Sequence, residues 1–414
     1  MVTEETFTMK DMIRYGVLEM VIRGSMTNSE AATSLGLSKR QVQRLKKRLI
    51  EEGPEGLIHG NRGKKSPRAF SDALRRKVIE LATNEYKGFN FSHLTEFLEE
   101  RESIKISRET TRKWLRAEGL GRKKRRLPKH RKRRKRSERE GQMLFLDGSP
   151  HVWFGDKKTT LILVTDDATG NPLRGTFRKN EDLDGCFYVC KGVFEQYGLP
   201  GCFYLDRASQ FTTTRHKGVH VEQSDMKPTQ FERAMQQLGI RLIFASSPQA
   251  RGRGERINGT FQDRLVAELA FHNITTQAPA EAYLNDVFIP RYQSRFGVAA
   301  ECATVAWRTV SPMIDLDNIL CKRFTRKVAN DNTISVNGTV LQLEPSHGRA
   351  HFIKAKVLVN LWIDGSYHVF HPTCGELTVT RVGKRSVRPQ ERGRSEHPKL
   401  KIDERSESAL LAIS

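Results

Sequence analysis

Three acidic residues occupy positions from which they could act together on a metal ion. Asp147 ends the apolar run Leu-Phe-Leu, Asp206 ends the run Phe-Tyr-Leu, and Glu255 opens a helical segment after Arg-Gly. Side chains at strand ends lie at the rim of a sheet, and a helix packed across that rim can bring a third carboxylate to the same point. Such oxygen ligands suit Mg²⁺ or Mn²⁺, and two ions about 4 Å apart could activate a nucleophile and stabilise a leaving oxygen. Taken alone, each acid is more simply a turn residue or a helix cap.

The elements that would position these acids begin near residue 141. Three antiparallel-style strands followed by β-α-β units predict a mixed α/β sheet. Residues 270–330 are predicted to be helical and connecting. The predicted strands are 143–147, 151–154, 159–165, 173–178, 202–205 and 241–244, and the predicted helices are 182–196, 229–238 and 254–269.

The first 120 residues predict only helices, arranged in two helix-turn-helix-like units. In the first unit, Gly36 separates a helix that starts at 27–32 from one opened by the capping-box pair Ser38 and Gln41. The second helix has one apolar stripe, and its other faces are polar, which is typical of a DNA-recognition helix. The alternative is a solvated basic face in an ordinary bundle. The stripe is Val42, Leu45 and Leu49, and the predicted DNA-binding residues are Lys39, Arg40, Gln43, Arg44 and Lys47.

A second helical unit follows a glycine-rich, basic connector. Its helices are marked by Leu74, by 93–99 and by a segment that begins after Ser107. The pattern suggests a second DNA-reading unit in tandem with the first. However, Trp114 and Leu115 fit a hydrophobic core as well as they fit a DNA contact.

Twelve of the fifteen residues from Arg122 to Arg136 are lysine or arginine. Like charges at this density repel, so the free segment should be extended and should become ordered against phosphates, with release of counterions. A solvated linker with no specific role is the alternative. The predicted DNA-binding residues here are Arg122, Lys123, Lys124, Arg125, Arg126, Arg131, Lys132, Arg133 and Arg134.

The bulk composition also indicates a polyanionic partner, because the formal charge is +23 and the pI is about 9.9. We find no apolar run of about 18 residues to span a bilayer and no signal-peptide pattern at the N-terminus, so we expect a soluble cytoplasmic protein associated with the nucleoid. The six scattered cysteines predict free thiols rather than a metal site.

Three segments carry a resemblance to a known family. Residues 205–211, Leu-Asp-Arg-Ala-Ser-Gln-Phe, resemble the turn at the second aspartate of retroviral-integrase-like transposases. Residues 246–260 resemble their third-carboxylate motif, a proline-containing loop that leads into Gly-Glu-Arg and a helix, and 161–170 resemble the hairpin after the first aspartate. The chain therefore resembles the DDE transposases of bacterial insertion sequences, with the ISNCY group the nearest likeness.

This resemblance implies that Asp147, Asp206 and Glu255 are both the catalytic residues and the ligands of Mg²⁺ or Mn²⁺, with two ions. Two departures stand out. Ala208 replaces the family's usual glycine, so that turn must avoid a glycine-only conformation, and Asp206 and Glu255 are further apart than is usual, with 212–227 as the inserted loop. The rival carboxylates, Asp166 and Asp167, fit a structural role in a hairpin better.

The C-terminal region contains two strong hairpin signals, Asn337-Gly338 and Asp364-Gly365, each between β-rich runs, and predicts a small all-β barrel. We therefore expect a multidomain α+β protein with helix-turn-helix units, an RNase H-like core and a small C-terminal β-barrel. The expected domains are 1–62 (helix-turn-helix), 63–120 (second such unit), 121–140 (basic linker), 141–272 (catalytic core), 273–331 (helical connection), 332–383 (barrel) and 384–414 (disordered tail).

The function expected from this reading is that of a transposase. It would bind the terminal inverted repeats of its element, cleave the DNA ends and join them to target DNA, and would work as a homo-oligomer on double-stranded DNA. A DNA-binding regulator or domesticated transposase with an inactive core is the main alternative. A stand-alone nuclease of the same fold is the second, and the two helical units and the basic linker argue against it.

Overall fold

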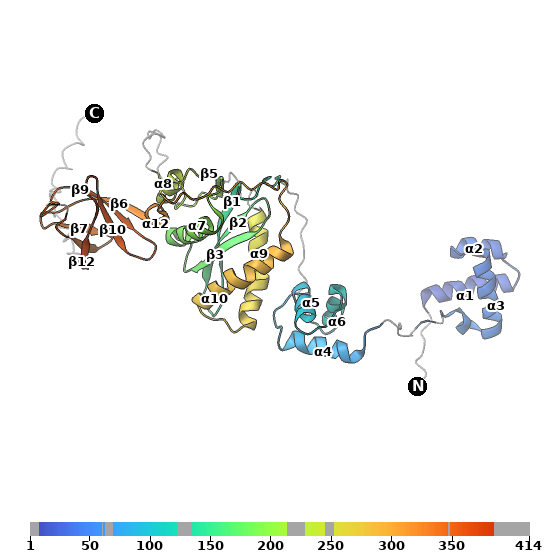
Figure 1. The fold of residues 1–414 in the computed structure, drawn as a ribbon. Coiled ribbons are helices and arrows are strands. Elements are labelled where there is room, and N and C mark those ends of the chain that lie inside the picture. Colours follow the sequence, from blue (N-terminus) through green and yellow to red (C-terminus); the bar gives the residue numbers. More distant parts are fainter. Residues whose placement is uncertain are drawn as a thin grey trace, which may run out of the picture. The chain divides into compact units, whose positions relative to one another are not determined.

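The structure is a computed structural model that describes residues 8–59, 61–62, 69–121, 134–212, 228–244, 252–346 and 348–384. The chain forms two compact units, Met1–Ile79 and Glu80–Ser414 (Figure 1). The greater part of the basic linker, the inserted loop and the predicted disordered tail lie outside the described residues. Within the described part of the chain, no helix is both long and apolar enough to cross a membrane.

The first unit is helical, as predicted. It contains α1 (Met9–Ile22), α2 (Asn28–Leu35), α3 (Lys39–Glu52) and the short 3₁₀ helix η1 (Pro54–Leu57), and α4 (Asp72–Thr83) begins at its end. Thr27 caps α2 and Ser38 caps α3, each with a complete capping box, and Gly36 ends α2 at a positive φ of 62°. Leu18, Ala31 and Val42 are fully buried between these helices and form the centre of a separate hydrophobic core.

Two further helices, α5 (Phe91–Glu100) and α6 (Arg108–Ala117), belong to the larger unit. Asn90 caps α5 by accepting hydrogen bonds from two backbone N–H groups, and Ser107 caps α6 as predicted.

A five-stranded sheet forms the centre of the larger unit. Its strands lie in the order β3-β2-β1-β4-β5, with β1, β2 and β3 antiparallel and β1, β4 and β5 parallel. The mixed α/β sheet is therefore confirmed. The predicted strand at 151–154 is wrong, because β1 simply continues to His151. The strands are β1 (Met143–His151), β2 (Thr159–Asp166), β3 (Pro172–Arg178), β4 (Cys202–Leu205) and β5 (Arg241–Phe244).

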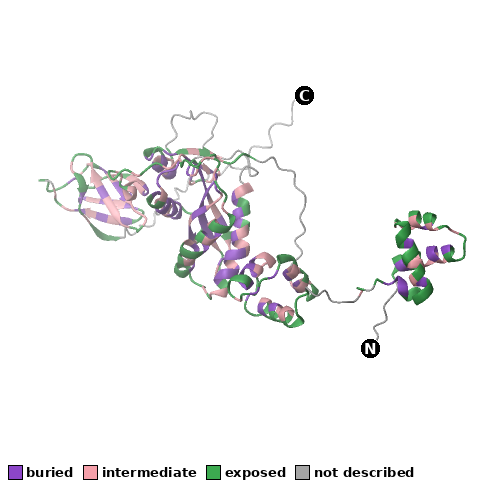
Figure 2. Ribbon diagram, turned by 45° about the vertical axis from the view of Figure 1, so that its right-hand side comes forward, coloured by how far each residue is buried: buried purple, intermediate pink, exposed green. Residues whose placement is uncertain are grey.

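Helices cover both faces of this sheet, since alternate residues of a strand point to opposite sides. Ile162 and Val164 of β2 pack in the core formed by α7 (Leu183–Tyr197) and α8 (Gln230–Gln237). Leu161 and Leu163 pack in the core on the other face. The elements there are α9 (Gly252–Phe271), α10 (Gln277–Tyr283), the π-helical turn η4 (Leu284–Phe288) and α11 (Ile289–Phe296). Figure 2 shows buried residues gathered on the strands and on the sheet-facing sides of these helices.

The C-terminal region follows α12 (Leu316–Ile319) and contains seven strands within its described residues. Its hydrogen bonds form a four-stranded sheet, β11-β10-β9-β6, and a three-stranded sheet, β12-β8-β7, that share one hydrophobic core. The pairing among these described strands does not close the predicted barrel. The strands are β6 (Lys322–Lys327), β7 (Thr333–Val336), β8 (Thr339–Leu343), β9 (Lys356–Leu361), β10 (Tyr367–His371), β11 (Gly375–Leu377) and β12 (Val379–Lys384).

Both predicted hairpins of this region are confirmed. Asn337 and Gly338, with φ of 49° and 82°, connect β7 to β8, and Gly365 turns the chain between β9 and β10 with φ of 87°. The prediction that 273–331 is helical is wrong at its end, because β6 forms there and pairs with β9. The charged, alternating sequence of β6 gives no strong strand signal, and its pairing partner is about 30 residues away in the chain.

Candidate active site

The pairing of two strands places two of the three predicted carboxylates on neighbouring strands. In the parallel pair of β1 and β4, Phe145 lies opposite Tyr204. Asp147 lies two residues beyond Phe145 in β1, and Asp206 directly follows Leu205, the last residue of β4. Both aspartates therefore lie just beyond the last paired residues of these parallel strands, and Asp147 contacts α9.

Helix α9 carries the third carboxylate and contacts the first. Asn258, which is 9% exposed, donates a hydrogen bond from Nδ2 to Oδ2 of Asp147 at 2.9 Å. Gly254 lies so close to Asp147 that a Cβ at this position would be 3.5 Å from Oδ2. Glu255 is exposed and lies one helical turn before Asn258, so it shares that side of α9.

These residues fit a divalent metal in their chemistry. They offer hard carboxylate oxygens, and two of them come from neighbouring strands, Asp147 within β1 and Asp206 directly after β4. Within the described residues, however, no group of three His, Cys, Asp or Glu side chains is already arranged as a metal cage. The segment that leads into α9, residues 245–251, lies outside the described part of the chain. The placement of Glu255 relative to the two aspartates is the part of the constellation that stays a prediction.

Asp166 and Asp167, the rival carboxylates, are both buried and both hold the fold together. Asp166 accepts hydrogen bonds from the backbone N–H groups of Gly141 and Thr169 and from the Thr169 hydroxyl. Burial raises the pKa of Asp166 above its ordinary value, against these hydrogen bonds. Asp167 forms ion pairs with Arg134 at 2.6 Å and Arg253 at 2.5 Å.

The end of the basic linker is thereby attached to the core. Arg134 also lies over the rings of Phe145 and Tyr204, at 5.7 and 5.6 Å from their centroids. Arg136 donates to the backbone oxygens of Asp167 and Ala168. Of the two arginines that flank Glu255, Arg253 is thus engaged by the buried carboxylate of Asp167, which the sequence alone did not indicate.

Two further residues near the carboxylates were not singled out from the sequence. Asn258 could have been found, because the spacing Glu-x-x-Asn puts both side chains on one helical face. Glu181 could not: a Cβ on Gly148, the residue after Asp147, would lie 2.3 Å from its Oε2, and it accepts a hydrogen bond from Gln210 at 2.8 Å.

The Ala208 turn forms without a glycine. Ala208 donates its backbone N–H to Oδ1 of Asp206 at 3.0 Å, and it is absent from the described residues with positive φ. The expectation that this turn avoids a glycine-only conformation is confirmed.

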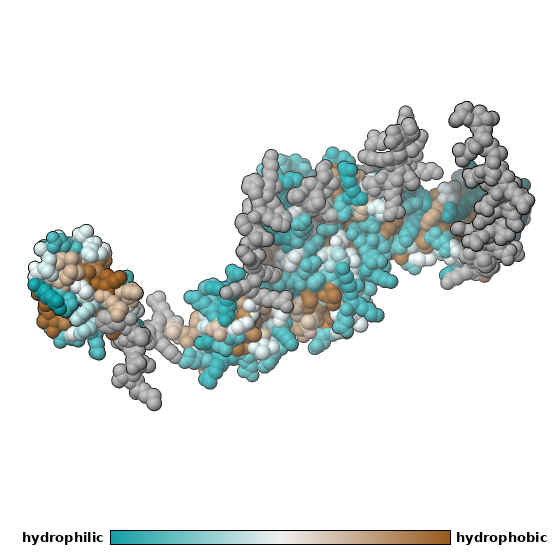
Figure 3. Space-filling model, turned by 180° about the vertical axis from the view of Figure 1, so that it is seen from behind, coloured by the Kyte–Doolittle hydropathy of each residue, from teal (hydrophilic) through white to brown (hydrophobic). Residues whose placement is uncertain are grey.

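The predicted recognition helix has the polar surface that DNA contact requires. Val42 and Leu49 are buried, whereas Gln43 and Arg44 are exposed. The other predicted contacts of α3, Lys39, Arg40 and Lys47, are exposed as well. On the face of the molecule seen in Figure 3, hydrophilic residues prevail over the described surface, and hydrophobic residues form small separate patches.

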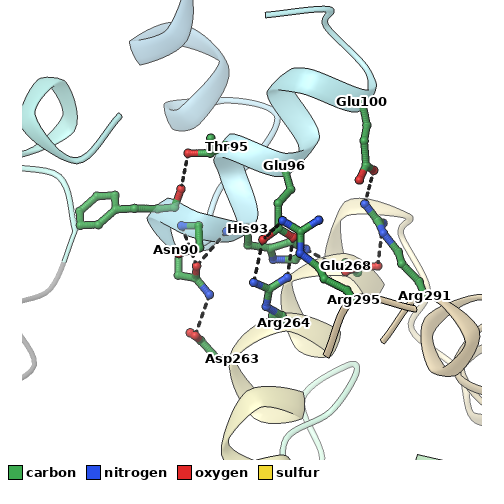
Figure 4. A network of polar contacts seen from close by, with 12 residues as sticks. Asn90, His93, Thr95, Glu96, Glu100, Asp263, Arg264, Glu268, Arg291 and Arg295 are labelled. Atoms are coloured by element: carbon green, nitrogen blue, oxygen red, sulfur yellow. Dashed lines mark hydrogen bonds and ion pairs between the residues drawn. The ribbon is translucent and has the colours of Figure 1, made fainter. Parts of the chain in front are cut away.

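A network of polar contacts joins α5 to α9 and α11 (Figure 4). Glu96 of α5 forms a two-pronged ion pair with Arg264 of α9 at 2.6 and 3.0 Å, and a further one with Arg295 of α11 at 2.7 Å. His93 contacts Glu268 at 2.8 Å through Nε2. The side chains of His93, Glu96 and Glu268 are each less than 10% exposed, so this is a buried interface.

The same network sets the ionisation of Glu268. Burial would raise the pKa of this carboxyl, but hydrogen bonds from His93 and Tyr283 outweigh burial and lower it. Arg291 of α11 adds ion pairs to Glu268 at 3.6 Å and to Glu100 of α5. The helix that carries Glu255 is therefore connected to α5 through charged groups.

Comparison with known proteins identifies the family. The chain is 31% identical over 363 residues to the putative transposase y4bF of Sinorhizobium fredii, a match that covers 87% of this chain and 78% of the relative. The chain belongs to the transposases of insertion sequences. This transposase is also 32% identical over 329 residues to the transposase for insertion sequence IS1202 of Streptococcus pneumoniae, with 70% and 69% covered. A winged helix-turn-helix family model matches its residues 14–76.

Solved structures similar to this transposase include retroviral integrases. The intasome of simian T-cell lymphotropic virus, in complex with a PP2A regulatory subunit, matches at 14% identity and a TM-score of 0.32, covering 67% of this chain and 96% of that chain. The HTLV-2 integrase catalytic core domain, in complex with magnesium, matches at 15% identity and a TM-score of 0.28, covering 36% and 86%.

Proposed function

We propose that this transposase binds the terminal inverted repeats of its element and cuts and joins phosphodiesters at Asp147, Asp206 and Glu255 in an RNase H-like core. The observation that supports the proposal is the parallel pairing of β1 and β4, because Asp147 in β1 and Asp206 after β4 both follow the paired residues Phe145 and Tyr204. The family membership supports DNA as the substrate.

The DNA-binding part of the proposal assigns sequence recognition to α3 and phosphate contacts to the basic linker. Arginine and glutamine on an exposed helix face can read guanine and adenine in the major groove. The linker supplies positive charge for contacts with phosphate groups. The proposed contacts are Lys39, Arg40, Gln43, Arg44 and Lys47 in α3, with Arg122, Lys123, Lys124, Arg125, Arg126, Arg131, Lys132, Arg133 and Arg134 in the linker.

The proposed chemistry has two displacements. A water oxygen attacks phosphorus at the element end, and the bond to the leaving 3′ oxygen breaks, which frees a 3′-hydroxyl. That hydroxyl then attacks a target phosphodiester, so one P–O bond forms for each that breaks, with no covalent protein intermediate. Working as a homo-oligomer on DNA would allow two element ends to be joined to one target.

The three carboxylates would hold two ions of Mg²⁺ or Mn²⁺, which would supply an activated nucleophile and charge stabilisation for the leaving oxygen. Asn258 acts on the protein side, because its amide donates a hydrogen bond to one oxygen of Asp147 and so fixes the orientation of that carboxylate. Glu255 is exposed on α9, so its side chain must turn toward the sheet to join Asp147 and Asp206 at the proposed metal site.

The test is cleavage and strand transfer of end-labelled duplex by Asp147→Asn, Asp206→Asn and Glu255→Gln, in Mg²⁺ and in Mn²⁺. Each variant keeps its size and loses its charge, so both reactions should fall to background while gel-shift binding to element ends survives. Because the three groups act together, the triple variant should be no worse than a single one.

Asp286→Asn is the matched control, since Asp286 is an exposed acid of the same unit and should leave turnover unchanged. Retained cleavage by Glu255→Gln would remove Glu255 from the triad. Absence of cleavage in the unmodified chain, with binding intact, would favour the alternative of a DNA-binding regulator with an inactive core.

A further inference from the structure

A cavity lies on the face of the sheet opposite to Asp147. Its volume is about 520 Å³, within the range of roughly 300–1,000 Å³ that is usual for ligand sites. One wall is β3 with Arg174 and Arg178, another is α7 with Tyr188 and Lys191, and the turn after β9 closes it with Trp362. Ile363 of that turn packs against the core cluster of α7, which holds this side of the cavity in place.

The acidic and the basic side chains that line this cavity differ in whether they have hydrogen-bond or ion-pair partners within the protein. Asp317 forms an ion pair with Lys191 at 2.6 Å, and Glu195 lies 3.7 Å from the same ammonium group. Asp364 accepts hydrogen bonds from the backbone and hydroxyl of Ser366. The acidic groups of the lining thus have partners within the protein.

The two arginines differ from these acids. Within the described part of the chain, neither the Arg174 nor the Arg178 side chain makes an ion pair or a hydrogen bond, and the Nε atom of each is buried without a partner. A buried donor without an acceptor is unfavourable, so a ligand that supplies acceptors would be favoured here.

The same arginines are held in position. Both guanidinium groups lie over the ring of Tyr188, 5.7 and 5.9 Å from its centroid. The stem of Arg174 crosses Gly192 of α7 so closely that a Cβ there would be 2.3 Å from Cδ and from Nε. Only glycine at this position leaves room for that path, so the two guanidiniums are placed in advance for an anion.

Phosphate is the anion that best suits this arrangement. Guanidinium groups donate paired hydrogen bonds to phosphate oxygens, and arginine is preferred where that geometry matters. Trp362, held by stacking on His368 and by donating its indole N–H to Asn318, adds a rigid aromatic surface of the kind on which nucleic-acid bases stack. Guanidinium groups that donate hydrogen bonds to phosphate, next to an aromatic ring that can stack on a base, match a DNA strand better than they match a free anion.

We propose that this cavity binds the sugar-phosphate backbone of a DNA strand, with Arg174 and Arg178 on the phosphates and Trp362 against a base. It would be a DNA contact separate from the carboxylates, because Arg174 pairs across the sheet with Val164, which faces α7, whereas Asp147 faces α9. The inference rests on the proposed function only in taking DNA as the substrate.

The experiment measures binding of the full chain to a fluorescent oligonucleotide at several salt concentrations, without divalent metal. Each phosphate contact contributes about 0.7–0.9 to the slope of log affinity against log salt. Arg174→Gln with Arg178→Gln should therefore lower this slope by about 1.4–1.8. Gly192→Ala keeps every charge but displaces Arg174, and should lower it by about half as much.

Arg241→Gln with Arg381→Gln removes two exposed charges elsewhere in the same unit and is the matched control. Hydrogen exchange localises the effect: the oligonucleotide should protect β3 and α7 in the unmodified chain and in the control, but not in the cavity variants. An equal slope change in the control, or no protection of β3 and α7, would overturn the proposal.

A parallel experiment with inorganic phosphate, at matched ionic strength, tests whether the cavity binds a free phosphate ion or the phosphate groups of a DNA strand. Protection of β3 and α7 by phosphate alone, as strong as that by the oligonucleotide, would assign the cavity to a free anion and overturn the DNA assignment. Because no metal is present, a failed carboxylate triad would leave these results unchanged.

Discussion

The first helical unit and the α5–α6 segment begin from similar sequence patterns and end in different surroundings. In the first, α1 to α3 enclose their own apolar core, and the polar face of α3 is exposed. In the second, α5 places Glu96 and His93 in a buried network with α9 and α11. A capped helix with a polar face can therefore leave that face exposed in one part of the chain and bury it in a network of charged groups in another.

The difference has a physical consequence for each region. An exposed charged face can exchange water for phosphate or base edges at little cost. A buried charged face depends on its partners, because removal of one partner leaves the other charge buried and unpaired. Changes in α3 should thus affect DNA binding, whereas changes in the network of α5 should affect stability and the helix that carries Glu255.

The largest effect is expected from Glu96→Ala, which leaves Arg264 buried without its two-pronged partner. We expect a loss of about 3–5 kcal/mol in the free energy of unfolding, with reduced cleavage because α9 loses its support. Denaturant unfolding, with hydrogen exchange on α5 and α9, measures it. Glu99→Ala is the control, since Glu99 is exposed and its ion pair with Lys105, at 3.6 Å, should contribute less than about 1 kcal/mol. Equal losses for both variants would make α5 an ordinary surface helix.

A smaller effect should show whether α3 and α6 differ in reading the DNA sequence. Gln43→Ala with Arg44→Ala should cost about 1–3 kcal/mol of discrimination between element ends and random DNA for each good contact. Arg112→Ala with Lys113→Ala in α6 should weaken both duplexes equally. Titrations at one fixed salt concentration measure this difference, and loss of discrimination in the α6 variant would contradict it and support the predicted second DNA-reading unit.

The smallest effect concerns acid and the Glu268 carboxylate. Its pKa in the folded protein is lowered from the ordinary value of 4.5, so its contribution to stability is present above pH 4.5 and is lost as the pH falls through the folded-state pKa. Glu268→Gln should remove this part of the acid sensitivity. Hydrogen exchange of α5 at neutral and acidic pH compares the two proteins, and identical pH profiles would show that this carboxylate does not secure α5.

The amino-acid sequence by itself determined most of the local structure. Capping pairs such as Ser38 with Gln41, and turns such as Asn337-Gly338, depend on residues within four positions of each other, so they can be identified without knowledge of the fold. The bounds of β4 and β5 were predicted to the residue because short β-rich runs bounded by turns are equally local signals. The candidate carboxylates were also found, from strand ends and the family resemblance.

Only the tertiary structure decided which of these groups meet. Asp147 and Asp206 belong to neighbouring strands because β1 and β4 pair in parallel, and Asp167 is structural because Arg134 and Arg253 surround it. Among the described residues, Arg174 is held over Tyr188 of α7 with its Nε atom buried and without a hydrogen-bond partner. Each of these facts joins residues far apart in the chain, and no periodicity or cap encodes such a contact. The burial of Glu96 has the same origin: a charged residue on a capped helix is exposed or buried according to what packs against it.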